Sequence, residues 1–130
     1  MNKPWGLSTS SLSNLASLYQ AQGKYEQAEP LYQRVLAIFE MQLGPEHPYT
    51  GTCLNNLAGL YQAQGKYEQA EPLYQRALPI LGKIVGPQHP ITIDVKQNLA
   101  SLHQKDNQIN EETEHQTTVR HQKDGSNQII

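Results

Sequence analysis

The amino-acid sequence predicts an all-α fold built from stacked helical hairpins, about two and a half of them. The first observation is an exact repeat: residues 18–34 and residues 60–76 both read LYQAQGKYEQAEPLYQR, 42 positions apart. The second is that apolar residues in each copy recur at the three- and four-residue spacing of a helix face. The third is that Gly and Pro residues interrupt these stretches at matching positions. Such self-similarity is typical of an array in which each unit packs against its neighbours.

The first helix of each unit is clearest in the second copy. Pro48 suits the first turn of a helix, because its missing N–H would have no partner there. One apolar face follows at helical spacing, and its residues are Leu54, Leu57, Ala58 and Tyr61. Gly65 is typical of the left-handed residue that ends a helix. The first copy has the same face, at Leu12, Leu15, Ala16 and Tyr19.

A second apolar stripe follows in each unit and predicts the other helix of a hairpin. In the second unit the stripe consists of Tyr67, Ala70, Tyr74, Ala77, Leu78 and Leu81. Its alanines leave room for two helix backbones to approach closely, and its tyrosines fill the space beside them. Pro30 and Pro72 should bend the start of these helices. Pro79 lies in the middle, so we expect this helix to be kinked or weakened after Leu78.

The patterns also predict where the units begin and end. The segments are an N-terminal extension (1–9), a first unit (10–47), a second unit (48–89), a degenerate third unit (90–122) and a frayed tail (123–130). The third unit keeps Asn98, Leu99 and Leu102, but His103 stands in place of the tyrosine. Its second half loses the apolar pattern. Its polar composition fits either a helix that caps the array or a disordered segment, and we expect a partial helix over Asn110–Gln122.

Composition and charge exclude several classes of protein. Hydrophobic residues make up 37% of the chain and the formal net charge is −2, so no global field favours nucleic acid or an acidic membrane. No run approaches the roughly 18 apolar residues of a membrane span, and the start lacks the apolar core of a secretion signal. A single cysteine, Cys53, fits a reducing compartment. We therefore expect a soluble, cytoplasmic protein that binds neither nucleic acid nor membrane.

No set of side chains in the sequence indicates catalysis, a cofactor or a metal ion. His47 and His89 lie in matching connectors directly before prolines, where a role at the entry of a helix is the simpler interpretation. They are one repeat apart, whereas metal ligands must cluster. Cys53 has no His or Asp at a suggestive spacing and is expected to be a small buried residue. We predict no enzyme activity, no cofactor and no metal site.

The stretch LNNLAGLYQAQGKYEQAEPLYQRAL, followed by GPQHP, resembles a tetratricopeptide repeat of the kinesin-light-chain-like subtype. The matching residues are Leu54, Leu57, Ala58, Tyr61, Gly65, Tyr67, Ala70, Tyr74 and Ala77. The common unit of the family has about 34 residues, and the extra length here lies in a longer second helix and the Gly-Pro-x-His-Pro connector. The resemblance covers roughly residues 10–105. It implies a right-handed superhelix of antiparallel helix pairs, with a concave groove lined mainly by the first helices.

Helical geometry predicts which side chains of the first helices avoid the core and face that groove. The candidate peptide-binding residues are Ser13, Asn14, Ser17, Gln20, Asn55, Asn56, Gln62, Gln97, Asn98 and Ser101. The same geometry places Ser10, Thr52 and Asp94 on this surface. Together these residues predict a nearly uncharged groove rich in amides and hydroxyls. Asn14, Asn56 and Asn98 recur every 42 residues and should form one column. An amide carries both a donor and an acceptor, so it can match the N–H and C=O of a peptide together.

Two interpretations of the asparagines stay open at this point. They bind an extended peptide, as the resemblance implies, or they bond to neighbouring helices and orient the stack. The groove lacks the lysines and arginines with which other tetratricopeptide domains hold the C-terminal carboxylate of chaperones. We therefore expect a protein-interaction scaffold for a peptide or a partner helix. The alternative is a self-associating element whose exposed ends form a homo-oligomer, or a piece of a longer array.

Overall fold

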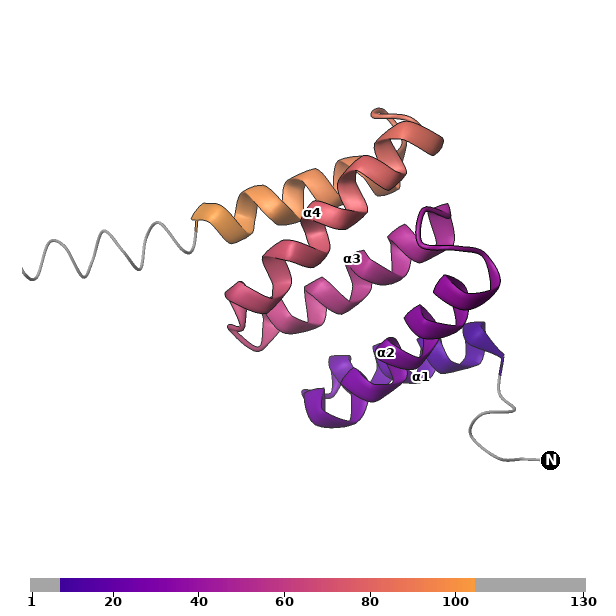
Figure 1. The fold of residues 1–130 in the computed structure, drawn as a ribbon. Coiled ribbons are helices and arrows are strands. Elements are labelled where there is room, and N and C mark those ends of the chain that lie inside the picture. Colours follow the sequence, from indigo (N-terminus) through magenta and orange to yellow (C-terminus); the bar gives the residue numbers. More distant parts are fainter. Residues whose placement is uncertain (1–7, 105–130) are drawn as a thin grey trace, which may run out of the picture.

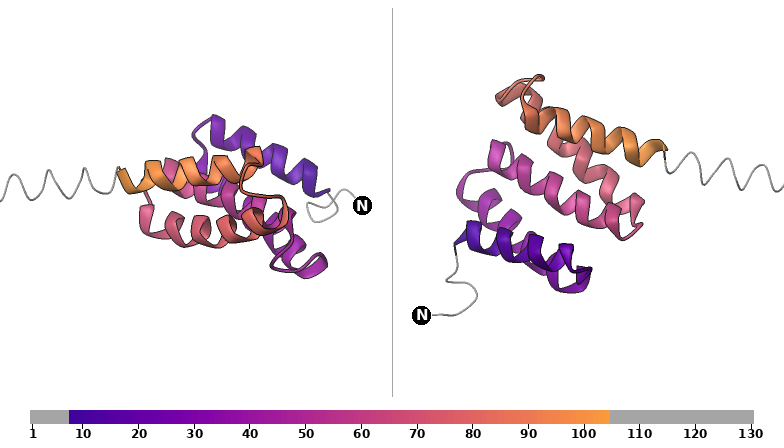
Figure 2. Two further views of the ribbon diagram at one scale, coloured as in Figure 1. Left: turned by 90° about the horizontal axis from the view of Figure 1, so that it is seen from above. Right: turned by 180° about the vertical axis from the view of Figure 1, so that it is seen from behind.

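The computed structural model describes residues 8–104, which form helices joined by short turns (Figure 1). The helices are α1 (Thr9–Ala21), α2 (Tyr25–Gln42), α3 (Pro48–Ala63), α4 (Tyr67–Ile84) and a fifth helical stretch over 90–104. We call α1, α3 and 90–104 the first helices, and α2 and α4 the second helices. They follow one another through the stack in chain order, from α1 at one end to 90–104 at the other (Figure 2). The predicted all-α repeat solenoid is confirmed. The helix expected over Asn110–Gln122 lies outside the described residues.

The turn inside each hairpin is made by a glycine in the left-handed conformation. Gly23 and Gly65 have φ of 76° and 77°, a region that is costly for residues with a Cβ atom. After α1, the N–H of Lys24 donates to the Tyr19 carbonyl at 2.8 Å, and that of Gly23 donates to the Gln20 carbonyl at 3.0 Å. These two bonds satisfy carbonyls that the end of the helix leaves free. The role predicted for Gly65 is confirmed.

The longer connectors between hairpins place a histidine at the start of the next helix. The Nδ1 atom of His47 accepts a hydrogen bond from the Tyr49 N–H at 3.0 Å, and that of His89 accepts one from the Ile91 N–H at 3.2 Å. Each ring thus satisfies a backbone donor that the first turn of a helix leaves without a partner. The helix-entry role predicted for both histidines is confirmed.

The largest core lies between α3, α4 and the helical stretch over 90–104. Its fully buried residues are Leu54, Ala58, Ala70, Tyr74, Ala77, Leu81, Val95 and Leu102. A smaller cluster joins the two hairpins, because Leu57 and Leu60 of α3 pack against Ala28 and Tyr32 of α2. Each buried leucine contributes roughly 1.5–3 kcal/mol of transfer free energy. The seam of alanines and tyrosines therefore stabilises both the hairpins and their stacking.

α4 continues past Pro79, the proline after which the sequence predicted a kinked or weakened helix. The helix continues to Ile84 and has 18 residues, the same length as α2, which has no proline at the matching position. Proline removes one backbone hydrogen bond. Leu81, two residues further on, is fully buried in the core, whereas Pro79 itself is exposed. The turn that follows the proline is thus packed against the core through Leu81.

Gly51 marks a close approach between α3 and α4, and it generates a first prediction. A Cβ atom at Gly51 would lie 3.0 Å from Leu81 Cγ and 3.3 Å from Ile80 Cγ2, whereas one at Gly59 would meet only the Tyr74 hydroxyl, at 3.7 Å. We expect Gly59→Ala to raise the free energy of unfolding by up to about 1 kcal/mol through helix propensity. Gly51→Ala should lower it by about 1 kcal/mol, because overpacking outweighs that gain. Urea unfolding followed by circular dichroism measures both, and equal effects would contradict the close approach.

Cys53 generates a second prediction, about alkaline stability. Burial raises the pKa of its thiol to about 12, so the unfolded chain loses that proton more readily than the folded protein. A raised pKa of this kind contributes stability that is complete below the unfolded value, about 8.5, and is lost as the pH rises toward the folded value. Cys53→Val is the matched variant, because Val95 occupies the equivalent position of the third unit and is fully buried.

Between about pH 8 and about pH 10 the wild type should lose more stability than Cys53→Val, since only the wild type can ionise the thiol on unfolding. Urea unfolding of both proteins at the two pH values measures the difference. Parallel losses in the two proteins would show that the buried thiol does not govern the effect.

Candidate functional site

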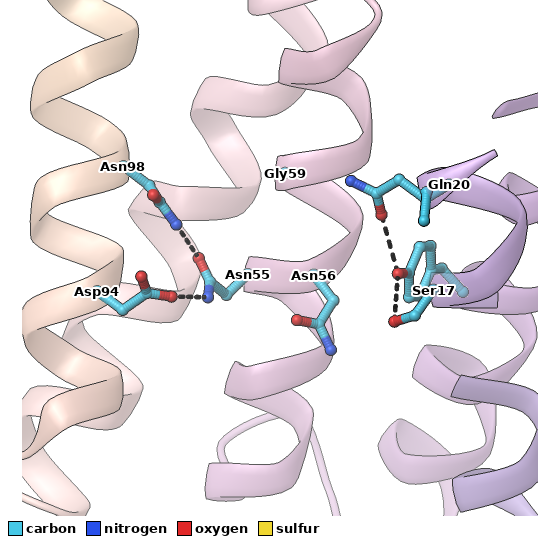
Figure 3. A pocket seen from close by; sticks show the side chains of 9 residues that line it. Ser17, Gln20, Asn55, Asn56, Gly59, Asp94 and Asn98 are labelled. Atoms are coloured by element: carbon cyan, nitrogen blue, oxygen red, sulfur yellow. Dashed lines mark hydrogen bonds between the residues drawn. The ribbon is translucent and has the colours of Figure 1, made fainter. Parts of the chain in front are cut away.

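The first helices enclose a polar hollow on one face of the solenoid (Figure 3). Its volume is about 420 Å³, and we call it the central hollow. The residues that line it are Ser17, Gln20, Ala21, Tyr32, Asn55, Asn56, Gly59, Asp94 and Asn98. All but Tyr32 come from the first helices. The repeat produces this surface, because residues in the same register of successive helices face the same way.

A second hollow of about 540 Å³ lies beside it, toward the start of α1, and we call it the outer hollow. It is lined by Thr9, Ser10, Ser13, Asn14, Phe39, Tyr49, Thr52, Cys53 and Asn56. Asn56 lines both hollows, so together they form one surface that we call the groove. The rings of Phe39 and Tyr49 have centroids 5.6 Å apart, and Tyr49 is 60% exposed. The outer hollow is therefore the more apolar end of the groove.

On the α1 side of the central hollow, a buried tyrosine holds two of the candidate groove residues. The Tyr32 hydroxyl donates to Gln20 Oε1 at 2.9 Å and shares a hydrogen bond with Ser17 Oγ at 3.2 Å. In the second hairpin the Tyr74 hydroxyl donates to Gln62 Oε1 at 2.8 Å. Because the phenol rings are buried in the core, each glutamine gives a hydroxyl its partner at the edge of the core.

On the opposite side, Asn55 links α3 to the helical stretch over 90–104. Its Nδ2 donates to Asp94 Oδ2 at 3.0 Å, and its Oδ1 accepts a bond from Asn98 Nδ2 at 3.2 Å. The prediction that Asn55 avoids the core is wrong, since its side chain is only 5% exposed. The helical stretch packs over it, and both polar ends of the amide are satisfied. Asn55 and Asn98 thus bond to neighbouring helices, which is the second of the two interpretations given for the asparagines.

Asn56 differs from its neighbour. It lies between the two hollows, and within residues 8–104 its side chain forms no hydrogen bond. In Figure 3 its amide projects into the space between the Gln20 side and the Asp94 side. Asn56 thus presents both a donor and an acceptor to whatever enters the groove.

The groove brings together seven of the ten candidate residues, and these are Ser13, Asn14, Ser17, Gln20, Asn55, Asn56 and Asn98. Gln62, Gln97 and Ser101 line neither hollow. Ser10, Thr52 and Asp94, which the sequence also placed on this surface, line the groove as well. Phe39 and Tyr49 were not among the predicted residues, because they lie outside the faces of the first helices from which the groove was predicted.

One charged side chain lies in the groove. Among the described residues that line the two hollows, Asp94 alone carries a charge. Its effect reaches the neighbouring core: burial raises the pKa of Tyr74 to about 12, and the Asp94 carboxylate adds to that rise. The tyrosine hydroxyl, which donates to Gln62, therefore keeps its proton further into the alkaline range than an exposed phenol does.

Residues 8–104 hold neither a metal-binding cluster nor a membrane-spanning helix. No three His, Cys, Asp or Glu side chains in this range gather closely enough to hold a metal ion. None of the helices in the described part combines the length and apolar character needed to cross a membrane.

Comparison with known proteins identifies the fold. The family model described as tetratricopeptide repeat matches residues 7–83 and 55–119. The structure of BtubC (BKLC) from P. vanneervenii is similar with a TM-score of 0.69 and 31% identity, over 75% of this chain and 39% of that one. A kinesin light chain-like protein from Podosopora anserina with nearly identical TPR-like repeats has a TM-score of 0.69 and 32% identity, over 85% and 52% of the two chains.

A substituted form of the Podosopora anserina protein gives a TM-score of 0.68 and 29% identity, over 78% of this chain and 48% of that one. The chain thus spans between 39% and 52% of the length of these three solved chains. No curated protein matches the sequence. The family model covers most of the chain, and the hairpins, their 42-residue period and the solved neighbours agree, so the chain belongs to the tetratricopeptide repeat family and is of its kinesin-light-chain-like type.

Proposed function

We propose that this chain is a binding scaffold, not an enzyme, and that it holds an extended peptide of a partner protein in the groove. Tetratricopeptide repeats generally mediate interactions between proteins. The observation that carries the proposal is Asn56, an amide at the junction of the two hollows that makes no hydrogen bond of its own within residues 8–104. The groove around it is lined by side chains of three successive first helices, as an extended ligand requires.

The chemistry of the lining suits a peptide backbone. Asn56 can donate to a peptide C=O and accept from a peptide N–H at the same time. Neighbouring amides are held in place by bonds to the core, as Gln20 is by Tyr32, so little side-chain entropy is lost on binding. Each such bond contributes only about 1 kcal/mol net. A groove of this size therefore supports binding of roughly micromolar strength.

Asn56→Ala tests the proposal. Peptides are first selected from a random display library on the purified chain, and their affinities are measured by fluorescence anisotropy. We expect the substitution to weaken binding about five-fold, because one paired amide is lost. Gln69→Ala is the matched control, since Gln69 is exposed on α4 and lines neither hollow. A folded protein that selects no peptide, or equal affinities for the wild type and Asn56→Ala, would refute the role of the groove.

A second candidate function is self-association, and the exposure of Leu18 favours it. Leu18, Leu60 and Leu102 occupy the same register of the three units. Leu60 and Leu102 are 0% and 1% exposed, because each packs against the preceding hairpin, whereas Leu18 is 53% exposed. A second copy of the chain could cover Leu18 in the way that one hairpin covers the next.

Leu18→Gln tests this second candidate. If the copies pair at this end, the wild type should form dimers or larger species in light scattering as concentration rises, and Leu18→Gln should stay monomeric. Leu60→Gln would unfold the core and is unsuitable, so Met41→Gln serves as the control, because Met41 is an exposed apolar residue of α2 that lines neither hollow. A wild type that remains strictly monomeric at high concentration eliminates this function.

A further inference from the structure

We propose that the groove selects peptides carrying a basic side chain, lysine or arginine, and that the Asp94 carboxylate is the group that holds it. This inference rests on the proposed peptide-binding function, and it names the chemical class of the ligand. It follows from three features of Asp94: its register in the repeat, its hydrogen bonding, and the charges around it.

The register shows that the charge is particular to one unit. Ser10, Thr52 and Asp94 occupy the same position of the three first helices, 42 residues apart, and all three line the groove. Two of them are small hydroxyl residues, and only the third is a carboxylic acid. The groove is therefore asymmetric, with a negative charge at the third unit and the aromatic pair of Phe39 and Tyr49 in the outer hollow, at the other end.

The hydrogen bonds of Asp94 fix its position without neutralising it. Asn55 Nδ2 donates to Oδ2 at 3.0 Å, and Asn55 is itself held by Asn98, so the carboxylate is oriented by a buried amide (Figure 3). The side chain is otherwise exposed, and within residues 8–104 its Oδ1 atom has no hydrogen-bond donor. A carboxylate accepts several hydrogen bonds, so most of its capacity remains for a ligand.

The charges nearby do not compensate for Asp94. The ion pairs found in the described part of the chain are Arg76 with Glu40 at 3.8 Å and His103 with Glu71 at 2.9 Å, and neither includes Asp94. Among residues 8–104, no basic residue lines either hollow. A cationic ligand group would thus meet a carboxylate that has no ion-pair partner within this range, and charge-assisted bonds are stronger than neutral ones. An acidic side chain would meet only repulsion.

Stabilisation of the helix itself is a weaker explanation for Asp94. Acidic residues stabilise the first turn of a helix, but the effect falls off beyond that turn. Helical residues begin at position 90, so Asp94 lies in the second turn. Its side chain is directed toward Asn55 and the central hollow (Figure 3).

Peptide pools with a fixed central residue test the inference. Four pools of short random peptides carry lysine, arginine, glutamine or glutamate at the centre, and their binding to the whole chain is measured by fluorescence anisotropy. We expect the lysine and arginine pools to bind about five-fold more tightly than the glutamine pool, as for a partly exposed ion pair. The advantage should shrink at high ionic strength because salt screens the charges. The glutamate pool should bind most weakly.

Asp94→Asn is the decisive variant, because its amide oxygen can still accept the bond from Asn55 while the charge is gone. We expect it to bind the lysine, arginine and glutamine pools equally, with its affinity for the glutamine pool unchanged from the wild type. Glu68→Gln removes one negative charge from an exposed position in the first turn of α4, outside the groove, and should keep the preference for basic peptides.

The outcomes separate this inference from the proposed function. If the wild type binds all pools equally, or if Asp94→Asn keeps the preference for basic peptides, the charge selection is wrong although peptide binding stands. If the folded wild type binds none of the pools, both the selection and the proposed function fall. A basic preference that disappears in Asp94→Asn and persists in Glu68→Gln supports both.

Discussion

The close contact between small residues of paired helices is the constraint on which this structure depends. Ala58 and Ala70 are fully buried where α3 meets α4, and Gly51 lies against Leu81 further along the same pair. Larger side chains at these positions would push the helices apart, since protein interiors are close-packed and overpacking strains them. The same alanine positions, Ala16 and Ala28, bring α1 against α2. The spacing set by these contacts determines where every other side chain of the hairpins lies.

The tyrosines connect this packing to the surface. With the alanines holding the helices close, the rings of Tyr32 and Tyr74 fill the space beside them. The Tyr32 hydroxyl emerges at the groove, and the Tyr74 hydroxyl reaches the edge of the core at Gln62. A buried hydroxyl needs a partner, and Gln20 and Gln62 supply one in each hairpin. The side chains at the edge of the groove are thereby anchored to the core. The packing of the apolar core therefore also fixes the position of polar side chains such as Gln20 in the groove.

The units differ where their surroundings differ. Leu12 and Leu54 are fully buried, but Lys96 stands in the same register of the third unit and is exposed. Conversely Leu60 and Leu102 are covered by a preceding hairpin, while their counterpart Leu18 is half exposed. Nearly identical local sequence thus has different burial according to the helix that lies next to it. The groove shows the same asymmetry, with its single carboxylate confined to one unit.

The sequence by itself determined the repeat, the helices and the turns, because these depend on local chemistry. Helical spacing of apolar residues and glycines that accept positive φ act over a few residues, so they can be read directly. Tertiary structure decided the outcome for Asn55, Asn56 and Pro79. Neighbouring in sequence, the two asparagines differ because a helix packed over one and left the other at the junction of two hollows. Whether a polar side chain is buried, or whether a helix continues past a proline, depends on which residues pack against it. Those residues lie far away along the chain, as Asp94 does from Asn55, so the local sequence does not reveal them.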